Sequence, residues 1–311
     1  MRYCAIFPGQ GSQKIGMGRD FFDNSKIARE MVEKASYRLD IDFENLLFEK
    51  NDRLELTQFS QPSILLVSTI AHKLFVQEVE KKPEFFLGHS LGEFSALSAS
   101  GAIDYLDAIE LVYNRGLLMA EACEGKDAGM MVLLGLSDVK TQEIVNSAQD
   151  RGKKIWAANY NCDGQIVVAG DKQDLAQMQS SFKEAGAKRA MLLNMSVASH
   201  CPILESAQIG LGEYLQKFIK DSFDAPIVSN VTAKPYDTKD EAKKLLNAQL
   251  VSPVLYKQSI KNIEEKIDKF VEFGGSVLKG INKKITKKET LSITDMSSLQ
   301  KTIDEILQND N

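Results

Sequence analysis

Two rhythms of hydrophobic and polar residues alternate along this chain. Short runs rich in aromatic and apolar residues, such as Tyr3–Phe7 and Phe85–Leu87, precede longer segments in which apolar residues recur at helical spacing. Strands that alternate with amphipathic helices are typical of an α/β fold. In the first part of the chain the predicted helices cover 21–39, 62–79, 91–100 and 104–123. We place the start of the second helix at Pro62 because proline suits a first helical turn.

The rhythm changes near Asp127. From there, strands are predicted at 130–134, 155–158, 166–169 and 190–193, with helices at 137–150 and 172–185. The order strand, helix, strand, strand, helix, strand is the ferredoxin-like pattern. We therefore predict a small inserted domain over 127–195 and a large domain formed by 1–126 and 196–311. The remaining predicted elements are a helix from Pro202 to about Lys220, strands at 227–229 and 270–273, and a helix at 297–307.

Composition and charge narrow the class of protein. Of the 311 residues, 43% are apolar and 26% are charged, which is ordinary for a globular protein with a large core. A net charge of −5 argues against a broad basic surface for nucleic acid. No stretch approaches the roughly 20 apolar residues of a membrane span, and the first residues lack the apolar run of a secretion signal. We expect a soluble, cytoplasmic protein with neither a nucleic-acid nor a membrane partner.

The cysteines support this expectation. The chain has four, at long and irregular spacings and without a CxxC pair: Cys4, Cys123, Cys162 and Cys201. This pattern fits free thiols in a reducing compartment better than a disulfide framework or a zinc site. We predict no bound metal.

The segment GHSLG, at residues 88–92, lies between a predicted strand and a predicted helix. A Gly-x-Ser-x-Gly in that setting is typical of a nucleophile elbow, in which the serine oxygen is exposed at the end of the sheet. There the free N–H groups and the positive end of the helix dipole favour a developing oxyanion. Ser90 is therefore a candidate nucleophile. The alternative is a glycine-rich turn with a capping serine.

A nucleophilic serine needs a base, which is usually a histidine, and the chain has three. His72 lies within a predicted helix, where a packing or surface role is expected. His89 adjoins Ser90, so its side chain should diverge from that of the serine. Elimination leaves His200, although a lone loop histidine is often structural. No acidic partner stands out, so a backbone or side-chain carbonyl could orient the imidazole instead.

One arginine lies on an apolar helix stripe. At helical spacing, Arg115 neighbours Leu111 and Val112 on one side and Leu118 and Met119 on the other. A guanidinium on such a stripe should be at least partly buried, and a buried guanidinium needs an anionic partner. An internal salt bridge or a snorkelling side chain would satisfy it. So would a bidentate clamp on a substrate carboxylate or phosphate.

At this point a set of motifs resembles a known family. In chain order the matching blocks are Phe7–Gln13 (FPGQGSQ), Gln61–Ile64 (QPSI), Gly88–Glu93 (GHSLGE), Arg115–Gly116, Gly164–Val167 (GQIV), Ser199–His200, Asn230–Thr232 (NVT), Gln249–Leu250, Pro253–Val254 and Gly280. Over roughly residues 1–290, the chain is similar to the bacterial malonyl-CoA:acyl-carrier-protein transacylases of fatty-acid synthesis. PGQGSQ together with GHSLGE makes this resemblance specific.

The resemblance implies a ping-pong acyl transfer. Ser90 would attack the thioester of malonyl-CoA with His200 as the base, which gives malonyl-Ser90 and free CoA. The phosphopantetheine thiol of acyl carrier protein would then take the malonyl group, again with help from His200. In this family the backbone N–H groups at Gln10 and Leu91 form the oxyanion hole. The backbone carbonyl of Gln249 orients the histidine, which would explain the missing acid.

The resemblance also implies a fold and a substrate site. Arg115 would pair with the malonyl carboxylate, and Gln61 and Met119 would help to bind the substrate. Malonyl-CoA is then a substrate rather than a resident cofactor, and the carrier protein brings its own phosphopantetheine. The implied fold is an α/β-hydrolase-like large domain with a mostly parallel sheet and a ferredoxin-like small domain. The active site would lie in the cleft between them.

Acyl carrier proteins are acidic, so a basic patch could bind one. The candidate docking residues are Lys279, Lys283, Lys284, Lys188 and Arg189. We predict a transient complex with a monomeric enzyme. The alternative for the lysine-rich segment 279–288 is an ordinary solvated surface.

Two other functions compete with acyl transfer. A serine hydrolase, an esterase or thioesterase, would use the same elbow but would release its acid to water and would have no need of Arg115. A non-catalytic scaffold of the same fold would need neither Ser90 nor His200.

Overall fold

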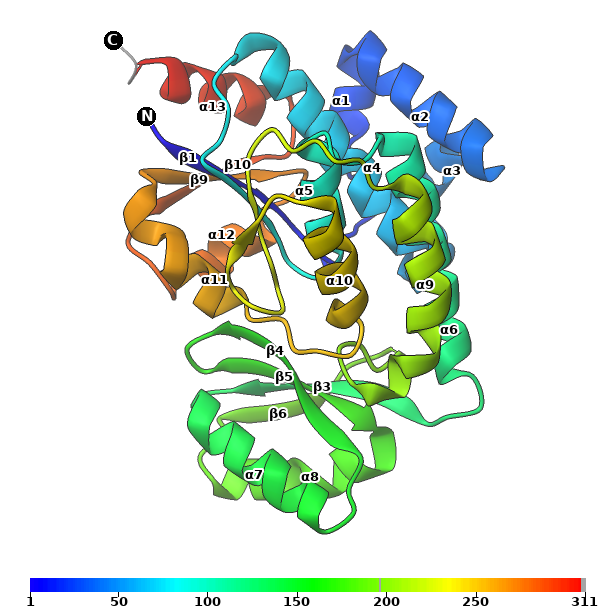
Figure 1. The fold of residues 1–311 in the computed structure, drawn as a ribbon, viewed down its shortest axis with the longest axis vertical. Helices are drawn as coiled ribbons and strands as arrows, with labels where there is room; N and C mark the ends of the chain where they lie inside the picture. The colour runs from blue at the N-terminus through cyan, green and yellow to red at the C-terminus, as the bar shows by residue number, and fades with distance from the viewer. Residues whose placement is uncertain (196, 309–311) are drawn as a thin grey trace.

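Strand β1 (Tyr3–Phe7) lies within a six-stranded sheet of order β10-β9-β1-β2-β7-β8 in the computed structural model, which describes residues 1–195 and 197–308 (Figure 1). The other strands are β2 (Phe85–Gly88), β7 (Ile227–Val228), β8 (Pro235–Tyr236), β9 (Lys269–Phe273) and β10 (Glu289–Ile293). All neighbouring strands run parallel except β7 and β8, which are antiparallel. The carboxyl ends of β1 and β2 therefore meet at one edge of the sheet, where binding sites of parallel sheets usually form.

Most helices pack with this six-stranded sheet, and together they are called the first unit below. They are α1 (Arg19–Asn24), α2 (Lys26–Leu39), α3 (Phe43–Phe48), α4 (Thr57–Glu78), α5 (Leu91–Ala99), α6 (Tyr105–Cys123), α9 (Glu205–Phe218), α10 (Lys239–Gln249), α11 (Tyr256–Ile263), α12 (Val277–Asn282) and α13 (Met296–Gln308). Short 3₁₀ turns cover Arg53–Glu55, Pro202–Leu204 and Glu264–Lys266.

The sheet is covered on both faces, which explains the unbroken apolar run at its centre. Successive side chains of a strand point to opposite faces. Tyr3, Ala5 and Phe7 pack in the main core with residues of α2, α4, α5 and α6. Cys4 and Ile6 pack in a second cluster with residues of α11 and α12. Strands buried on both faces read as continuous hydrophobic runs in this way.

A second sheet of four antiparallel strands lies beyond the first unit (Figure 1). Its strands are β3 (Ala128–Leu134), β4 (Ile155–Cys162), β5 (Gln165–Asp171) and β6 (Arg189–Leu192), in the order β4-β5-β3-β6. Helices α7 (Asp138–Asp150) and α8 (Lys172–Glu184) cover the face that carries Met131 and Val168. On the opposite face, Met130 and Val167 join the main core. This sheet is thus held between its own helices and the first unit.

The predicted helix over 21–39 is wrong, because two helices meet there at Ser25. Ser25 is extended, with φ −130° and ψ 125°, and its hydroxyl accepts a hydrogen bond from the N–H of Ala28. That bond caps the start of α2. The apolar spacing continues across the break, so periodicity alone does not reveal it.

Two predicted helix starts are also corrected. Helix α4 begins at Thr57, so Pro62 lies inside the helix rather than in its first turn. Residues 57–61 are polar or aromatic, and three of them are buried by tertiary packing rather than by an apolar stripe. The segment after Pro202 begins as a 3₁₀ turn, and the α-helix proper starts at Glu205.

Within residues 1–195 and 197–308, no helix has both the length and the apolar composition needed to cross a membrane. All four cysteines are buried free thiols. The predicted domain boundary at residue 196 and the last three residues of the chain lie outside the described residues.

Candidate active site

The turn between β2 and α5 holds Ser90 in a conformation that few serines adopt. Its φ of 53° and ψ of −107° lie outside the regions favoured by L residues. The flanking glycines are needed for close packing. A Cβ on Gly88 would overlap the backbone of Gly92, and a Cβ on Gly92 would overlap the carbonyl oxygen of Phe7. The GHSLG segment therefore sets α5 directly against β1 and places Ser90 at the N-terminus of α5.

Side chains from two distant segments hold this backbone. The Ser90 N–H donates to Asn230 Oδ1 at 2.7 Å, and the Ser90 carbonyl accepts from Gln249 Nε2 at 3.1 Å. Asn230 Nδ2 also donates to the Gly88 carbonyl at 2.7 Å. A strained backbone persists only where its surroundings determine it several times over. These three bonds do so for Ser90.

Ser90 and His200 form a hydrogen-bonded pair. The Ser90 Oγ lies 2.8 Å from His200 Nε2, and His200 Nδ1 lies 2.7 Å from the backbone carbonyl oxygen of Gln249. A carbonyl oxygen can only accept, so Nδ1 must carry the proton. In the neutral ring, Nε2 then accepts the hydrogen bond from the Ser90 hydroxyl. This is the tautomer that a general base needs.

His200 is held in its neutral form. Burial, together with the nearby positive charge of Arg115, lowers its pKa to about 3. The residue also has a positive φ of 61°, so both members of the pair have left-handed backbones. The structure thus joins the two predicted reactive residues, from segments 110 positions apart in sequence.

The Arg115 side chain is 2% exposed and lies beside Ser90. Its Nη1 donates to Gln61 Oε1 at 2.6 Å, and its Nη2 donates to Gln249 Oε1 at 3.1 Å and to Ser90 Oγ at 3.4 Å. Neither an ion pair nor a snorkelling geometry is found for it in the described part of the chain. Burial lowers its pKa only to about 10, so the group keeps its charge at neutral pH. A buried cation held by neutral amides is suited to binding an anionic group.

A cavity of about 310 Å³ is lined by Ser90, His200 and Arg115. Its lining comes from both units of the molecule, with Gln10, Ser90, Leu91, Arg115, Met119 and His200 from the first and Met130, Asn159, Asn161 and Val167 from the second. Leu91 is the first residue of α5, so its N–H is one of those that the helix leaves unpaired. Gln61 lies behind Arg115, where its Nε2 donates to Thr57 Oγ1 at 2.7 Å and to the sulfur Sδ of Met119 at 3.5 Å.

The other two histidines have different surroundings. His89 Nε2 lies 2.7 Å from Asn161 Oδ1, which links the elbow to β4. His72 packs its ring edge-to-face against Phe7, Phe86 and Phe273. Among the described residues, neither of these two imidazoles hydrogen-bonds the Ser90 hydroxyl, in agreement with the packing and local hydrogen-bonding roles predicted for them.

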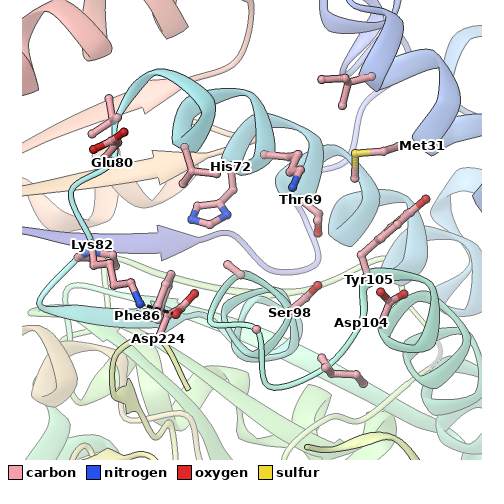
Figure 2. Close-up of a pocket in the computed structure, with 18 of the residues that line it drawn as sticks. Met31, Thr69, His72, Glu80, Lys82, Phe86, Ser98, Asp104, Tyr105 and Asp224 are labelled. Atoms are coloured by element: carbon pink, nitrogen blue, oxygen red, sulfur yellow. Dashed lines mark hydrogen bonds and ion pairs between the residues drawn. The ribbon is translucent and has the colours of Figure 1, made fainter. Parts of the chain in front are cut away.

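A larger cavity, of about 720 Å³, lies among α2, α4, β2 and the end of α5 (Figure 2). The His72 ring projects from α4 toward the strand that carries Phe86 (Figure 2). His72 lines this cavity, and its buried Nε2 atom has no hydrogen-bond partner among the described residues. The ion pair Lys82–Asp224 lies at the cavity wall. The larger cavity therefore lacks the paired nucleophile and base of the smaller one.

Sequence reasoning assigned no role to three polar residues of the site. Asn230 bonds the Ser90 N–H, Asn161 bonds His89, and Glu93 is a fully buried carboxylate below Gln249. Glu93 could have been identified from the sequence, because it is a charged residue within the apolar helix segment 91–97. Like Arg115, a charged residue in such a segment should be at least partly buried and should need polar partners.

Comparisons with known proteins agree with this geometry. A model of the acyl transferase domain family matches residues 5–300. The malonyl CoA-acyl carrier protein transacylase of Bacillus subtilis (strain 168) is 36% identical over 312 residues, which cover 98% of each chain. The crystal structure of the malonyl-CoA:acyl carrier protein transacylase of Helicobacter pylori matches with a TM-score of 0.95 and 45% identity over 99% of each chain. A malonyl-transacylase solved in complex with its type II polyketide-synthase acyl-carrier protein (PlMCAT:AntF) matches with a TM-score of 0.93 and 31% identity, over 98% of this chain and all of that one.

Proposed function

Because the chain belongs to the acyl transferase family, and within it to the malonyl-CoA:acyl-carrier-protein transacylases, we propose that Ser90 carries the malonyl group between the two substrates. The enzyme transfers malonyl from malonyl-CoA to the phosphopantetheine thiol of acyl carrier protein, for fatty-acid synthesis. The observation that carries the assignment is the position of Ser90 Oγ, 2.8 Å from His200 Nε2 and 3.4 Å from Arg115 Nη2. An activated serine thus lies next to a buried cation.

In the first half-reaction, Ser90 Oγ attacks the thioester carbonyl carbon while His200 Nε2 takes the hydroxyl proton. The backbone N–H groups of Gln10 and Leu91 would stabilise the oxyanion. When the carbon–sulfur bond breaks, the imidazolium returns its proton to the CoA sulfur. The Gln249 carbonyl keeps His200 oriented throughout, since it accepts from Nδ1.

In the second half-reaction the roles reverse. His200 takes the proton from the phosphopantetheine thiol, and the sulfur attacks the ester carbonyl of malonyl-Ser90. The ester bond breaks, and Ser90 Oγ regains its proton from the imidazolium. Arg115 would pair with the malonyl carboxylate in both steps, while Gln61 and Met119 support its position from behind.

The arrangement of sheets supports a division into two domains. We assign 1–126 and 196–311 to an α/β-hydrolase-like catalytic domain and 127–195 to a ferredoxin-like small domain. The order β4-β5-β3-β6, with α7 and α8 on one face, supports the second assignment. Residues of both domains line the cavity around Ser90.

The predicted carrier-protein surface gains support from its position. Lys283, Lys284, Lys188 and Arg189 are exposed and Lys279 is half-buried. The Lys284 charge acts on Cys162, and Lys188 packs beside Gly135, whose N–H donates to the Gly164 carbonyl. The lysines thus flank the β4–β5 hairpin, above which Figure 1 shows α11 and α12.

We propose that the acidic carrier protein docks at this hairpin. The double substitution Lys188→Glu and Lys284→Glu should raise the KM for carrier protein about tenfold at low salt and leave the malonyl-CoA half-reaction unchanged. An unchanged KM would move the docking surface elsewhere. The monomeric state and the cytoplasmic location stay predictions.

Intact-mass spectrometry tests the chemistry directly. After mixing with malonyl-CoA, the protein should gain one malonyl group, and Ser90→Ala should gain none. Carrier protein should remove the adduct much faster than water does. Rapid discharge by water would instead indicate a hydrolase.

A further inference from the structure

A carboxylate that touches no reacting atom lies directly behind the elbow. Glu93 is the third residue of α5 and is completely buried. Its Oε2 accepts from Gln249 Nε2 at 2.7 Å and from the Asn230 N–H at 3.1 Å, while its Oε1 accepts from the Tyr236 hydroxyl at 3.2 Å. All three partners are donors, which an ionised carboxylate satisfies without competition.

Two of these partners are the residues that hold Ser90. Asn230 binds the Ser90 N–H, and Gln249 binds the Ser90 carbonyl. Gln249 also binds Arg115 Nη2 through its side-chain oxygen and His200 Nδ1 through its backbone oxygen. One carboxylate therefore binds the side chain of Gln249 and the backbone of Asn230. These two residues provide the hydrogen bonds that hold the nucleophile, the base and the cation.

The charge of Glu93 has a second effect. Arg115 is buried and has no ion pair with any described residue, and the Glu93 carboxylate is the group whose charge favours its protonated form. In return, the arginine, the amide donors and Tyr236 favour the ionised carboxylate, against burial that raises the pKa of Glu93 to about 7. Hydrogen bonding and charge can be separated, because glutamine keeps the shape of glutamate without its charge.

We propose that Glu93 is a positioning residue for the acylation of Ser90, acting through its hydrogen bonds to Gln249 and Asn230. The proposal rests on the function assigned above, in which Ser90 takes up malonyl. It predicts a loss in the chemical step rather than in substrate binding, since Arg115 keeps its bond to Gln61 Oε1.

The test compares Glu93→Ala with Glu93→Gln in single-turnover acylation by malonyl-CoA. Glu93→Ala should lower the acylation rate constant by about 10- to 100-fold, as expected for losing charge-assisted hydrogen bonds, with the malonyl-CoA concentration at half-maximal rate changed less than threefold. Glu93→Gln should stay within about threefold of the unmodified enzyme. Its oxygen can accept from Gln249 and Asn230, and its amide can donate to Tyr236, whose hydroxyl can also accept.

Tyr236 provides a second test, independent of whether Glu93→Ala folds. In Tyr236→Phe the amide of Glu93→Gln loses its acceptor, so the double variant should acylate at least fivefold more slowly than Glu93→Gln alone. Glu272 supplies a matched control. It is another fully buried carboxylate, which accepts from the N–H groups of Leu278 and Lys279. Glu272→Gln should lower stability but leave acylation per folded molecule unchanged.

The outcomes separate the two claims. If the unmodified enzyme forms no malonyl-Ser90, the proposed function fails. If it does, and Glu93→Ala acylates at the same rate, the positioning role is overturned. Equal losses in Glu93→Ala and Glu93→Gln would also overturn it, because the charge alone would then be responsible. A similar loss in Glu272→Gln would show a general effect of buried carboxylates.

Discussion

Two buried histidines stay neutral for the same main reason but have different neighbours. His72 lies beside the larger cavity, and His200 lies beside Ser90. Burial lowers the pKa of His72 to about 4 and that of His200 to about 3. His72 has three phenylalanine rings around it, and its Nε2 has no hydrogen-bond partner in the part of the chain that the structure describes. His200 has a carbonyl at one nitrogen and a serine hydroxyl at the other. Neutrality is thus common to buried histidines, and the hydrogen-bond partners decide whether the ring can act as a base.

The largest expected effect comes from removing each ring in turn. His200→Ala should slow acylation of Ser90 by about a thousandfold, because a positioned base contributes on that order. His72→Leu should leave the rate per folded molecule unchanged. Stopped-flow measurement of the malonyl-enzyme checks both. A rate loss in His72→Leu comparable with that in His200→Ala would remove the distinction between the two cavities.

Arg115 sharpens the comparison, because only the smaller of these two cavities has a buried cation beside its histidine. Arg115→Ala should lower kcat/KM for malonyl-CoA by about 100-fold, as expected for losing a charge-assisted contact, and should affect acetyl-CoA little. Arg115→Lys keeps the positive charge but lacks the planar guanidinium, so its kcat/KM for malonyl-CoA should lie between those of the unmodified enzyme and Arg115→Ala. An Arg115→Ala enzyme that still prefers malonyl-CoA would contradict the carboxylate clamp.

The smallest expected effect is on stability. The unfolded chain protonates His72 near pH 6.5, whereas the folded protein does so only near pH 4. The stabilising contribution is therefore present above pH 6.5 and is lost as the pH falls toward 4. Between pH 7 and pH 5, the unfolding free energy of His72→Leu should rise by about 2 kcal/mol relative to the unmodified protein. Urea unfolding at the two pH values measures it, and a constant difference would show that the imidazole is not neutral in the fold.

Much of the architecture follows from local patterns. The run Tyr3–Phe7 predicts a strand because both of its faces are apolar, and Asp104 predicts the start of α6 because its carboxylate accepts from the Leu106 N–H. Other elements escape this reasoning. Strand β8 has only two residues, and the N–H groups of Leu278 and Lys279 at the start of α12 donate to the Glu272 carboxylate on the preceding strand β9. Neither a two-residue strand nor a capping carboxylate on the strand before a helix gives a hydrophobic period that can be recognised in the sequence.

The reactive residues could be proposed from sequence because each has an unusual local setting. Ser90 lies between two glycines, His200 is the histidine left after elimination, and Arg115 interrupts an apolar stripe. The residues that hold these three in place could not be identified in this way. Asn230 is an ordinary loop asparagine in sequence, and its importance arises only when folding brings it to the Ser90 N–H. The family resemblance pointed to the Gln249 carbonyl, which no side-chain pattern reveals.

The left-handed backbone at Ser90 also bears on how this protein can be engineered. Glycine accommodates a positive φ without strain, so Ser90→Gly relaxes the elbow while it removes the nucleophile. A library selected only for heat resistance would be drawn toward that substitution, and its most durable members would be inactive. Any stabilisation campaign on this scaffold therefore needs a selection for turnover alongside the thermal one.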